Sequence, residues 1–177
     1  MEGKSSRGRE QMILESLSML PKHMLSLRDR DNVSHFLLHA LSGERCFNFN
    51  KAAYFVDNPD FHCLRGIAGF FKEEDQKSHD HVWHTPENFQ DHIQHSMFNK
   101  LVRDIMHESI KAKAVAHEQG MQDIAQALGF NNYNVCSWDM LHDNHGVLVY
   151  EKADPQDDVV ENYLLNGMSL LSFCPLF

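Results

Sequence analysis

Histidines crowd one short part of the chain. Five of the thirteen lie within seventeen positions, and imidazole nitrogens beside carboxylates are good ligands for zinc, iron or nickel. On a helix, His92 and His95 would be surface neighbours three residues apart, with Asp91 close by. Because no HExxH motif and no cysteine-rich ligand set accompanies them, we favour solvated histidines. A small metal-dependent enzyme or metal-binding domain is the alternative. The five are His79, His81, His84, His92 and His95.

Two further patterns are similar to catalytic motifs. The pair His79-Asp80 is similar to the HD dyad of metal-dependent phosphohydrolases, but that fold is all-helical and this chain contains apolar strands. Cys136, with His142 or His145 nearby, would suit a Cys/His nucleophile pair. These residues straddle a turn, and buried cysteines usually pack in a core. We therefore assign no catalytic residue and expect a domain that is not an enzyme.

Composition narrows the classes of partner. The 177 residues are 42% hydrophobic and 23% charged, which is typical of one folded domain with a substantial core. The net charge of −9 argues against nucleic acid, since duplex binding needs a broad basic face. No apolar run reaches the roughly 18–20 residues of a membrane span, so we expect no membrane insertion. Four scattered cysteines without CxxC spacing or a signal peptide favour a reducing cytoplasm.

Apolar spacing predicts helices at both ends and in the middle of the chain. The first helix carries a short coiled-coil-like seam, and Pro21 is expected to kink or break it. The long middle helix begins with Thr85-Pro86-Glu87, and its buried stripe would be Phe89, Ile93, Met97, Leu101 and Ile105. The predicted helices are 9–27, 32–42, 86–107, 121–128 and 154–173.

Strands are predicted between these helices. The hairpin 46–71 turns at residues 57–60 and is apolar on both faces, so helical layers must cover it twice. Residues 110–116 alternate like a short strand, and 133–141 pairs with 146–152. Strict alternation predicts two sets of side chains that each share a face: Phe47, Phe49, Ala53 and Phe55 in one strand, and Leu64, Ala68 and Phe70 in the next. The fold class predicted is α+β: a central antiparallel sheet of five to six strands with helices on both faces and the terminal helices forming a bundle.

This order of elements resembles the GAF domain family, the small regulatory modules of sensor kinases, cyclic-nucleotide enzymes and bacterial regulators. The first two GAF strands are similar to FNFNKAAYFVDNPDFHCLRGIAGF, and the final GAF hairpin is similar to LGFNNYNVCSWDMLHDNHGVLVYEKA. The resemblance implies an N-terminal helix for linkage and dimerisation over 1–30 and a sensory domain over 31–177 that includes the exit helix. It also implies a small-molecule sensor in a bacterial signal-transduction protein, such as a two-component system, that relays ligand state through its terminal helices.

The resemblance further implies a homodimer, an output domain in the parent protein, and a pocket under the middle helices. The cofactor stays unknown, because the NKxnFxxxDE signature of cyclic-nucleotide binders is incomplete and His62-Cys63 reverses the Cys-His pair of bilin sites. The same aromatic residues suit a filled core equally well. The pocket candidates are Trp83, His84, Phe89, His92, Tyr133, Cys136 and Trp138. The dimer-interface candidates are Ile13, Leu17, Leu20, Met24, Leu27, Val160, Tyr163, Leu164, Gly167 and Leu171.

Overall fold

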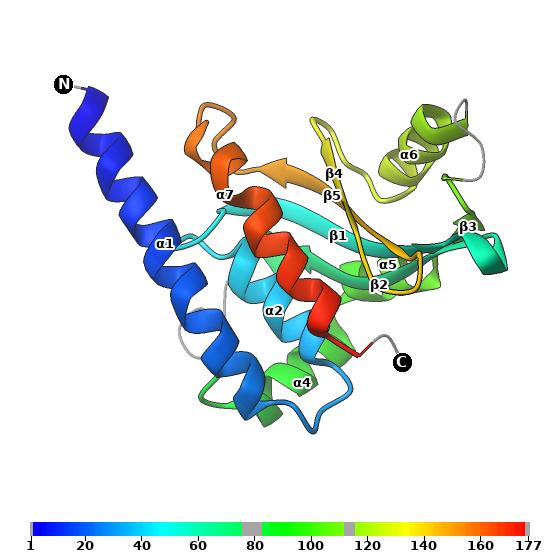
Figure 1. The fold of residues 1–177 in the computed structure, drawn as a ribbon, viewed down its shortest axis with the longest axis horizontal. Helices are drawn as coiled ribbons and strands as arrows, with labels where there is room; N and C mark the ends of the chain where they lie inside the picture. The colour runs from blue at the N-terminus through cyan, green and yellow to red at the C-terminus, as the bar shows by residue number, and fades with distance from the viewer. Residues whose placement is uncertain (1, 76–82, 112–115, 176–177) are drawn as a thin grey trace.

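One antiparallel sheet organises the chain (Figure 1). The computed structural model describes residues 2–75, 83–111 and 116–175, and within them five strands follow the order β3-β2-β1-β5-β4. The strands are β1 (Phe49–Asn58), β2 (Cys63–Phe71), β3 (Met106–Glu108), β4 (Asn134–Asp139) and β5 (His145–Lys152). Both predicted hairpins are present, as β1–β2 and β4–β5. The predicted α+β class with an antiparallel sheet is therefore confirmed.

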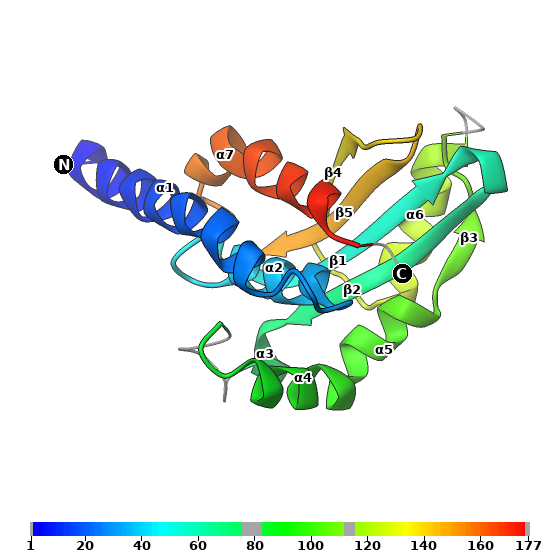
Figure 2. The same cartoon turned by 60° about the horizontal axis from the view of Figure 1, so that its bottom comes forward.

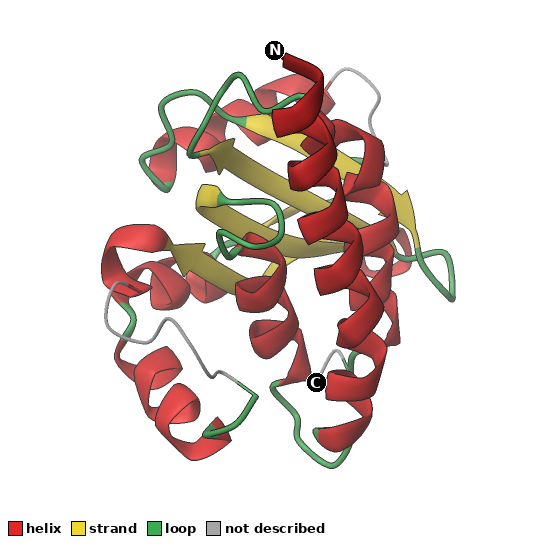
Figure 3. Cartoon of the chain, turned by 90° about the vertical axis from the view of Figure 1, so that its left-hand side faces the viewer, coloured by secondary structure: helices red, strands yellow, loops and turns green. Residues whose placement is uncertain are grey.

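Helices cover both faces of this sheet (Figures 2 and 3). The first face, which we call the terminal-helix face, packs Ala52, Tyr54 and Tyr150 against the helices from the two ends of the chain. The opposite face packs Ala53 and Phe55 against two central helices. On the terminal-helix face lie α1 (Glu2–Ser26), α2 (Val33–Ser42), α4 (Pro86–His95), α7 (Val159–Met168) and the 3-10 helix η2 (Ser169–Phe173); α5 (Met97–Asp104) and α6 (Ala116–Ala127) cover the opposite face.

Two irregularities in the strands decide which residues share a face. The register of β1 with β2 shifts between Tyr54 and Phe55, so Leu64 faces α5 while Ala68 and Phe70 face α2. A second shift follows Phe49 and places its ring 4.8 Å from that of Tyr150 on the terminal-helix face. Strict alternation was therefore wrong for Leu64, and for Phe47 and Phe49, which pack on the terminal-helix face while Ala53 and Phe55 pack on the opposite one. A bulge adds one residue and reverses every side chain beyond it.

The predicted helix from Pro86 to His107 is two helices, because the chain is extended at Ser96 (φ −63°, ψ 118°). The Ser96 hydroxyl caps α5 by accepting a hydrogen bond from the Asn99 amide at 3.0 Å. The Glu74 carboxylate, from the short helix α3 (Lys72–Asp75), accepts from the Ser96 hydroxyl at 2.6 Å and from the Phe98 amide at 3.1 Å. Ser96 and the Glu74 carboxylate thus start a new helix in the middle of the apolar stripe that was predicted to be one helix.

This break changes which side of the second helix is buried. Phe98 and Val102 pack onto the sheet, whereas Met97 and Leu101 are 62% and 50% exposed. The predicted four-residue stripe was therefore right for Phe89 and Ile93 in α4 and wrong in α5.

Three other element boundaries differ from expectation. Helix α1 continues through Pro21, because Leu20 and Leu27 are buried on both sides of the proline and packing outweighs the lost hydrogen bond. The strand expected at 110–116 is wrong: β3 lies earlier and pairs with the start of β2, while Ala116 already belongs to α6. Residues 112–115 lie outside the described part. The last helix begins at Val159 rather than Asp154.

The predicted dimer seam lies inside the single chain. Ile13 and Leu20 of α1 are 0% and 4% exposed, and Gly167 of α7 packs so closely that a Cβ there would lie 2.6 Å from the ring of Phe47. The other candidates on these helices are buried or half-buried against the same core, so they hold α1 and α7 to their own domain. A dimer through α1 would therefore use its exposed residues, such as Met12 and Met19, instead.

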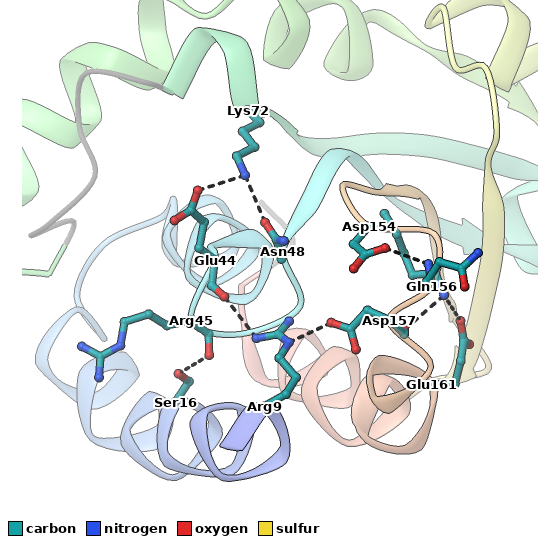
Figure 4. A network of polar contacts seen from close by, with 11 residues as sticks. Arg9, Ser16, Glu44, Arg45, Asn48, Lys72, Asp154, Gln156, Asp157 and Glu161 are labelled. Atoms are coloured by element: carbon teal, nitrogen blue, oxygen red, sulfur yellow. Dashed lines mark hydrogen bonds and ion pairs between the residues drawn. The ribbon is translucent and has the colours of Figure 1, made fainter. Parts of the chain in front are cut away.

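Polar contacts fix α1 to two loops that are distant in sequence (Figure 4). Arg9 pairs with Asp157 (Nε–Oδ2 2.7 Å), which precedes α7, and donates to the Glu44 carbonyl at 3.1 Å. Two turns further along α1, the Ser16 hydroxyl donates to the Arg45 carbonyl at 3.0 Å. The position of α1 therefore depends on both the α2–β1 loop and the β5–α7 loop.

The Arg9–Asp157 pair is expected to contribute measurable coupling to stability. Its side chains are only 16% and 13% exposed, so solvent screens the attraction weakly. A double-mutant cycle with Arg9→Ala and Asp157→Ala, followed by urea unfolding, should give a coupling of about 1–2 kcal/mol. The matched control is Arg28–Asp29, which is 3.9 Å apart and 76% and 93% exposed, and should give a coupling near zero. Equal coupling in both cycles would contradict a specific role for Arg9.

Candidate functional site

The predicted pocket residues fall into separate places. Trp83 stacks on His23 of α1 with ring centroids 4.9 Å apart, and Phe89 packs on Phe36 of α2 with ring centroids 4.4 Å apart. His84 is exposed at the start of the same segment. These aromatic side chains fill the core between α1, α2 and α4.

Two of the pocket candidates, Trp138 and Cys136, lie beneath η2, and a third, Tyr133, lies on the opposite face of the sheet. Trp138 stacks on Tyr54 at 5.7 Å and donates from Nε1 to the Ser172 hydroxyl at 2.9 Å. Cys136 packs beside it, and burial raises the pKa of its thiol to about 11. Tyr133 packs on the opposite core instead. The structure therefore does not bring the seven candidates together into one pocket.

The histidine cluster does not converge on one point within the described residues. His92 Nε2 and the buried His39 Nδ1 both lie 3.4 Å from Asp75 Oδ1. Burial, and then the nearby His39, lower the pKa of His92, while Asp75 raises it. His95 turns away to the Asp91 carbonyl, 2.8 Å from its Nδ1. No group of three or more His, Cys, Asp or Glu in this part of the chain is arranged to hold a metal ion; His79 and His81 lie outside it.

The Cys/His nucleophile pair is also separated. Cys136 is paired in register with Leu148 and faces η2, whereas His145 is paired with Asp139 and faces the other side of the hairpin. His145 Nδ1 lies 2.9 Å from Asp139 Oδ1, and its Nε2 contacts the Lys111 ammonium. Cys136 and His145 thus lie on opposite faces of the β4–β5 hairpin, because successive residues of a strand alternate between its two faces.

A cavity with several polar side chains in its wall lies where α1 turns into α2. Its volume is about 630 Å³, and it is bounded by residues 29–32, the first turn of α2, the middle of β2, and α4 with the end of α5. Ile67, Ile93 and Pro175 supply an apolar part of the wall. This cavity is on the terminal-helix face, and residues of α4 and the end of α5, both within the predicted middle helix, form part of its wall. On the opposite face Phe55, Phe98 and Val102 fill the space between the sheet and α5.

Three arginines line this cavity. Arg30 is held at its rim by Glu87, 2.6 Å away, and by the Gln90 side chain. Arg65 in β2 is opposite Val56 and so points to the terminal-helix face, while Arg103 comes from the last turn of α5. Neither Arg65 nor Arg103 has an ion pair or side-chain hydrogen bond with another described residue, and both are exposed.

His35 forms the buried part of the same wall. Its side chain belongs to the first turn of α2, is 8% exposed, and has no hydrogen-bond partner of good geometry on either ring nitrogen among the described residues. Burial lowers the pKa of His35 to about 4, helped by the charge of Arg103 and of His39 and opposed by the backbone of Asn32. Both ring nitrogens are buried from solvent, so the neutral imidazole keeps its donor and acceptor behind the surface of the cavity wall.

The sequence alone did not identify Arg65, Arg103 and His35 as residues of one site. Arg65 interrupts an otherwise apolar strand and His35 interrupts an apolar helix, which are the only local signals. Their position around one cavity with Arg103 depends on the packing of α5 against β2, which no spacing rule predicts. A search of protein-family models, curated proteins and solved structures found no match to this chain, so its site is interpreted from its own geometry.

Proposed function

We propose that this chain is a regulatory domain that senses a small molecule in the cavity between α2, β2, α4 and α5. The observation that carries the proposal is the 630 Å³ cavity itself, whose wall combines the apolar Ile67 and Ile93 with the polar side chains of Arg65 and Arg103. Pockets of about 300–1,000 Å³ with an apolar wall and a few placed polar groups are typical of small-molecule sites.

The location of the cavity supports a relay through the terminal helices. Residues 29–32, which join α1 to α2, form one side of the cavity, so a ligand would contact the connection itself. A ligand that prefers one packing of α1 on α2 would shift the population of that packing. This is the behaviour expected of a GAF-like sensor domain in a bacterial signalling protein, with an output domain reading the terminal helices.

A broad ligand screen tests the sensory function without assuming a ligand class. Thermal shift with neutral, cationic and anionic metabolites should find at least one compound that stabilises the protein by mass action. Hydrogen exchange should then slow in residues 29–36 when that compound binds. Gln94→Trp fills the cavity from an exposed position of α4 and should abolish the shift.

The matched control is Gln122→Trp, an exposed glutamine of α6 on the opposite side of the sheet. It adds the same side chain without touching the cavity and should keep full binding. If no compound stabilises the protein, or if both tryptophan variants behave alike, the cavity is not a sensory site.

A further inference from the structure

The cavity differs in charge from the rest of the protein. The chain as a whole carries a net charge of −9, yet the cavity wall carries three arginines against two aspartates. The Asp29 side chain is 93% exposed and lies beside Arg28 rather than Arg65 or Arg103. The other aspartate, Asp31, is also exposed and lies one position before the N-cap of α2. Arg65 and Arg103 are thus two guanidinium groups without an ion pair to a described residue, and guanidinium groups on a concave surface attract anions.

The first turn of α2 adds a second source of positive potential. This ten-residue helix begins beside the cavity, its N-cap Asn32 makes no side-chain capping hydrogen bond, and its first turn holds no acidic residue. Amide groups at a helix N-terminus bind phosphate and carboxylate oxygens. His35 lies in that same turn, but both of its ring nitrogens are buried from solvent, so its imidazole adds no donor to the cavity.

The size and the apolar part of the wall indicate more than an inorganic ion. A volume of about 630 Å³ suits a small organic molecule, and Ile67 with Ile93 would contact its uncharged body. Arginine is the side chain best suited to bind phosphate or carboxylate, because its planar fork donates two parallel hydrogen bonds.

We propose that the cavity binds a small organic anion, whose phosphate or carboxylate group is held by Arg65, Arg103 and the first turn of α2. The inference rests on the sensory function proposed above and names the chemical class of its ligand. Arg30 is a positioning residue here, since Glu87 already occupies its guanidinium group.

Sodium phosphate and sodium succinate are the probes, titrated at constant ionic strength into isotope-labelled protein against sodium chloride. Each backbone amide is followed by NMR. Binding should shift the amides of residues 33–36, 65 and 103, and the double variant Arg65→Ala/Arg103→Ala should weaken binding by at least about tenfold. A response to phosphate alone identifies a phosphate ester as the ligand class, and a response to succinate alone identifies a carboxylate.

The control variant is Arg7→Ala/Arg45→Ala, which removes two exposed arginines outside the cavity and changes the net charge equally. It should bind both probes like the unmodified protein. The proposal is overturned if neither probe shifts these amides beyond chloride, or if both double variants weaken binding equally. If neither probe binds but the screen finds a neutral ligand whose binding Gln94→Trp abolishes, the anion proposal fails and the sensory function stands. If the screen finds no ligand at all, both proposals fail.

Discussion

Gly66→Ala is expected to destabilise the protein by about 3 kcal/mol or more. A Cβ at Gly66 would lie 1.8 Å from the carbonyl oxygen of Val102, and the neighbouring Gly69 packs against Phe98 and Asn99 of α5. The clash is with backbone, so no rotamer change relieves it, and α5 must move away from β2. Urea unfolding should show a lower midpoint at an unchanged slope, which indicates lost stability without a change in exposed surface.

Gly8→Ala is the control for this substitution. Its position in α1 has no atom within 4 Å of the added Cβ, so alanine should stabilise the helix by up to about 1 kcal/mol. An unchanged midpoint for Gly66→Ala would contradict the contact between α5 and β2. Because the same contact brings Arg103 towards Arg65, that result would also remove the basis of the anion site.

Stability is expected to fall by about 3 kcal/mol between pH 6.5 and pH 4 through His35 alone. Above the ordinary pKa of 6.5 the ring is neutral in the folded and unfolded states, so its contribution to stability is fully present. Burial lowers the folded-state pKa to about 4, so between these values the unfolded chain binds a proton that the folded chain does not. A difference of about 2.5 units at 1.36 kcal/mol per unit gives the expected loss.

His35→Gln removes this titration and keeps a polar side chain. Urea unfolding of both proteins at several pH values should show that the unmodified protein loses about 3 kcal/mol more than the variant on acidification. His95→Gln, whose side chain is 75% exposed, controls for the loss of a histidine on the surface. A difference between His35→Gln and the unmodified protein that does not depend on pH would contradict a buried, neutral His35.

Much of the fold follows from local patterns. Apolar strands on both sides of polar turns predicted both hairpins and an antiparallel sheet, because turn residues and period-two alternation act over a few neighbouring positions. The amphipathic spacing predicted α2 and the buried part of α4 for the same reason. Local patterns failed at Ser96, where the Glu74 carboxylate, 22 positions earlier, helps to begin a new helix.

The candidate site was not predictable in this way. The aromatic residues chosen for a pocket pack in two parts of the core and on opposite faces, since apolar residues in a pattern look alike whether they line a cavity or fill it. Arg65, Arg103 and His35 are single residues in unrelated elements, and only their shared position around one cavity distinguishes them from surface arginines and a core histidine.

The sequence by itself determined the class of fold, the hairpins and the apolar faces that must be covered, because these depend on neighbouring residues. Only the tertiary structure decided that α1 and α7 pack on their own sheet, that Phe98 and Val102 fill the space between the sheet and α5, and that the polar cavity lies beside α2. The physical reason is that burial and charge depend on which distant elements meet: α5 must cross β2 before Arg103 comes near His35.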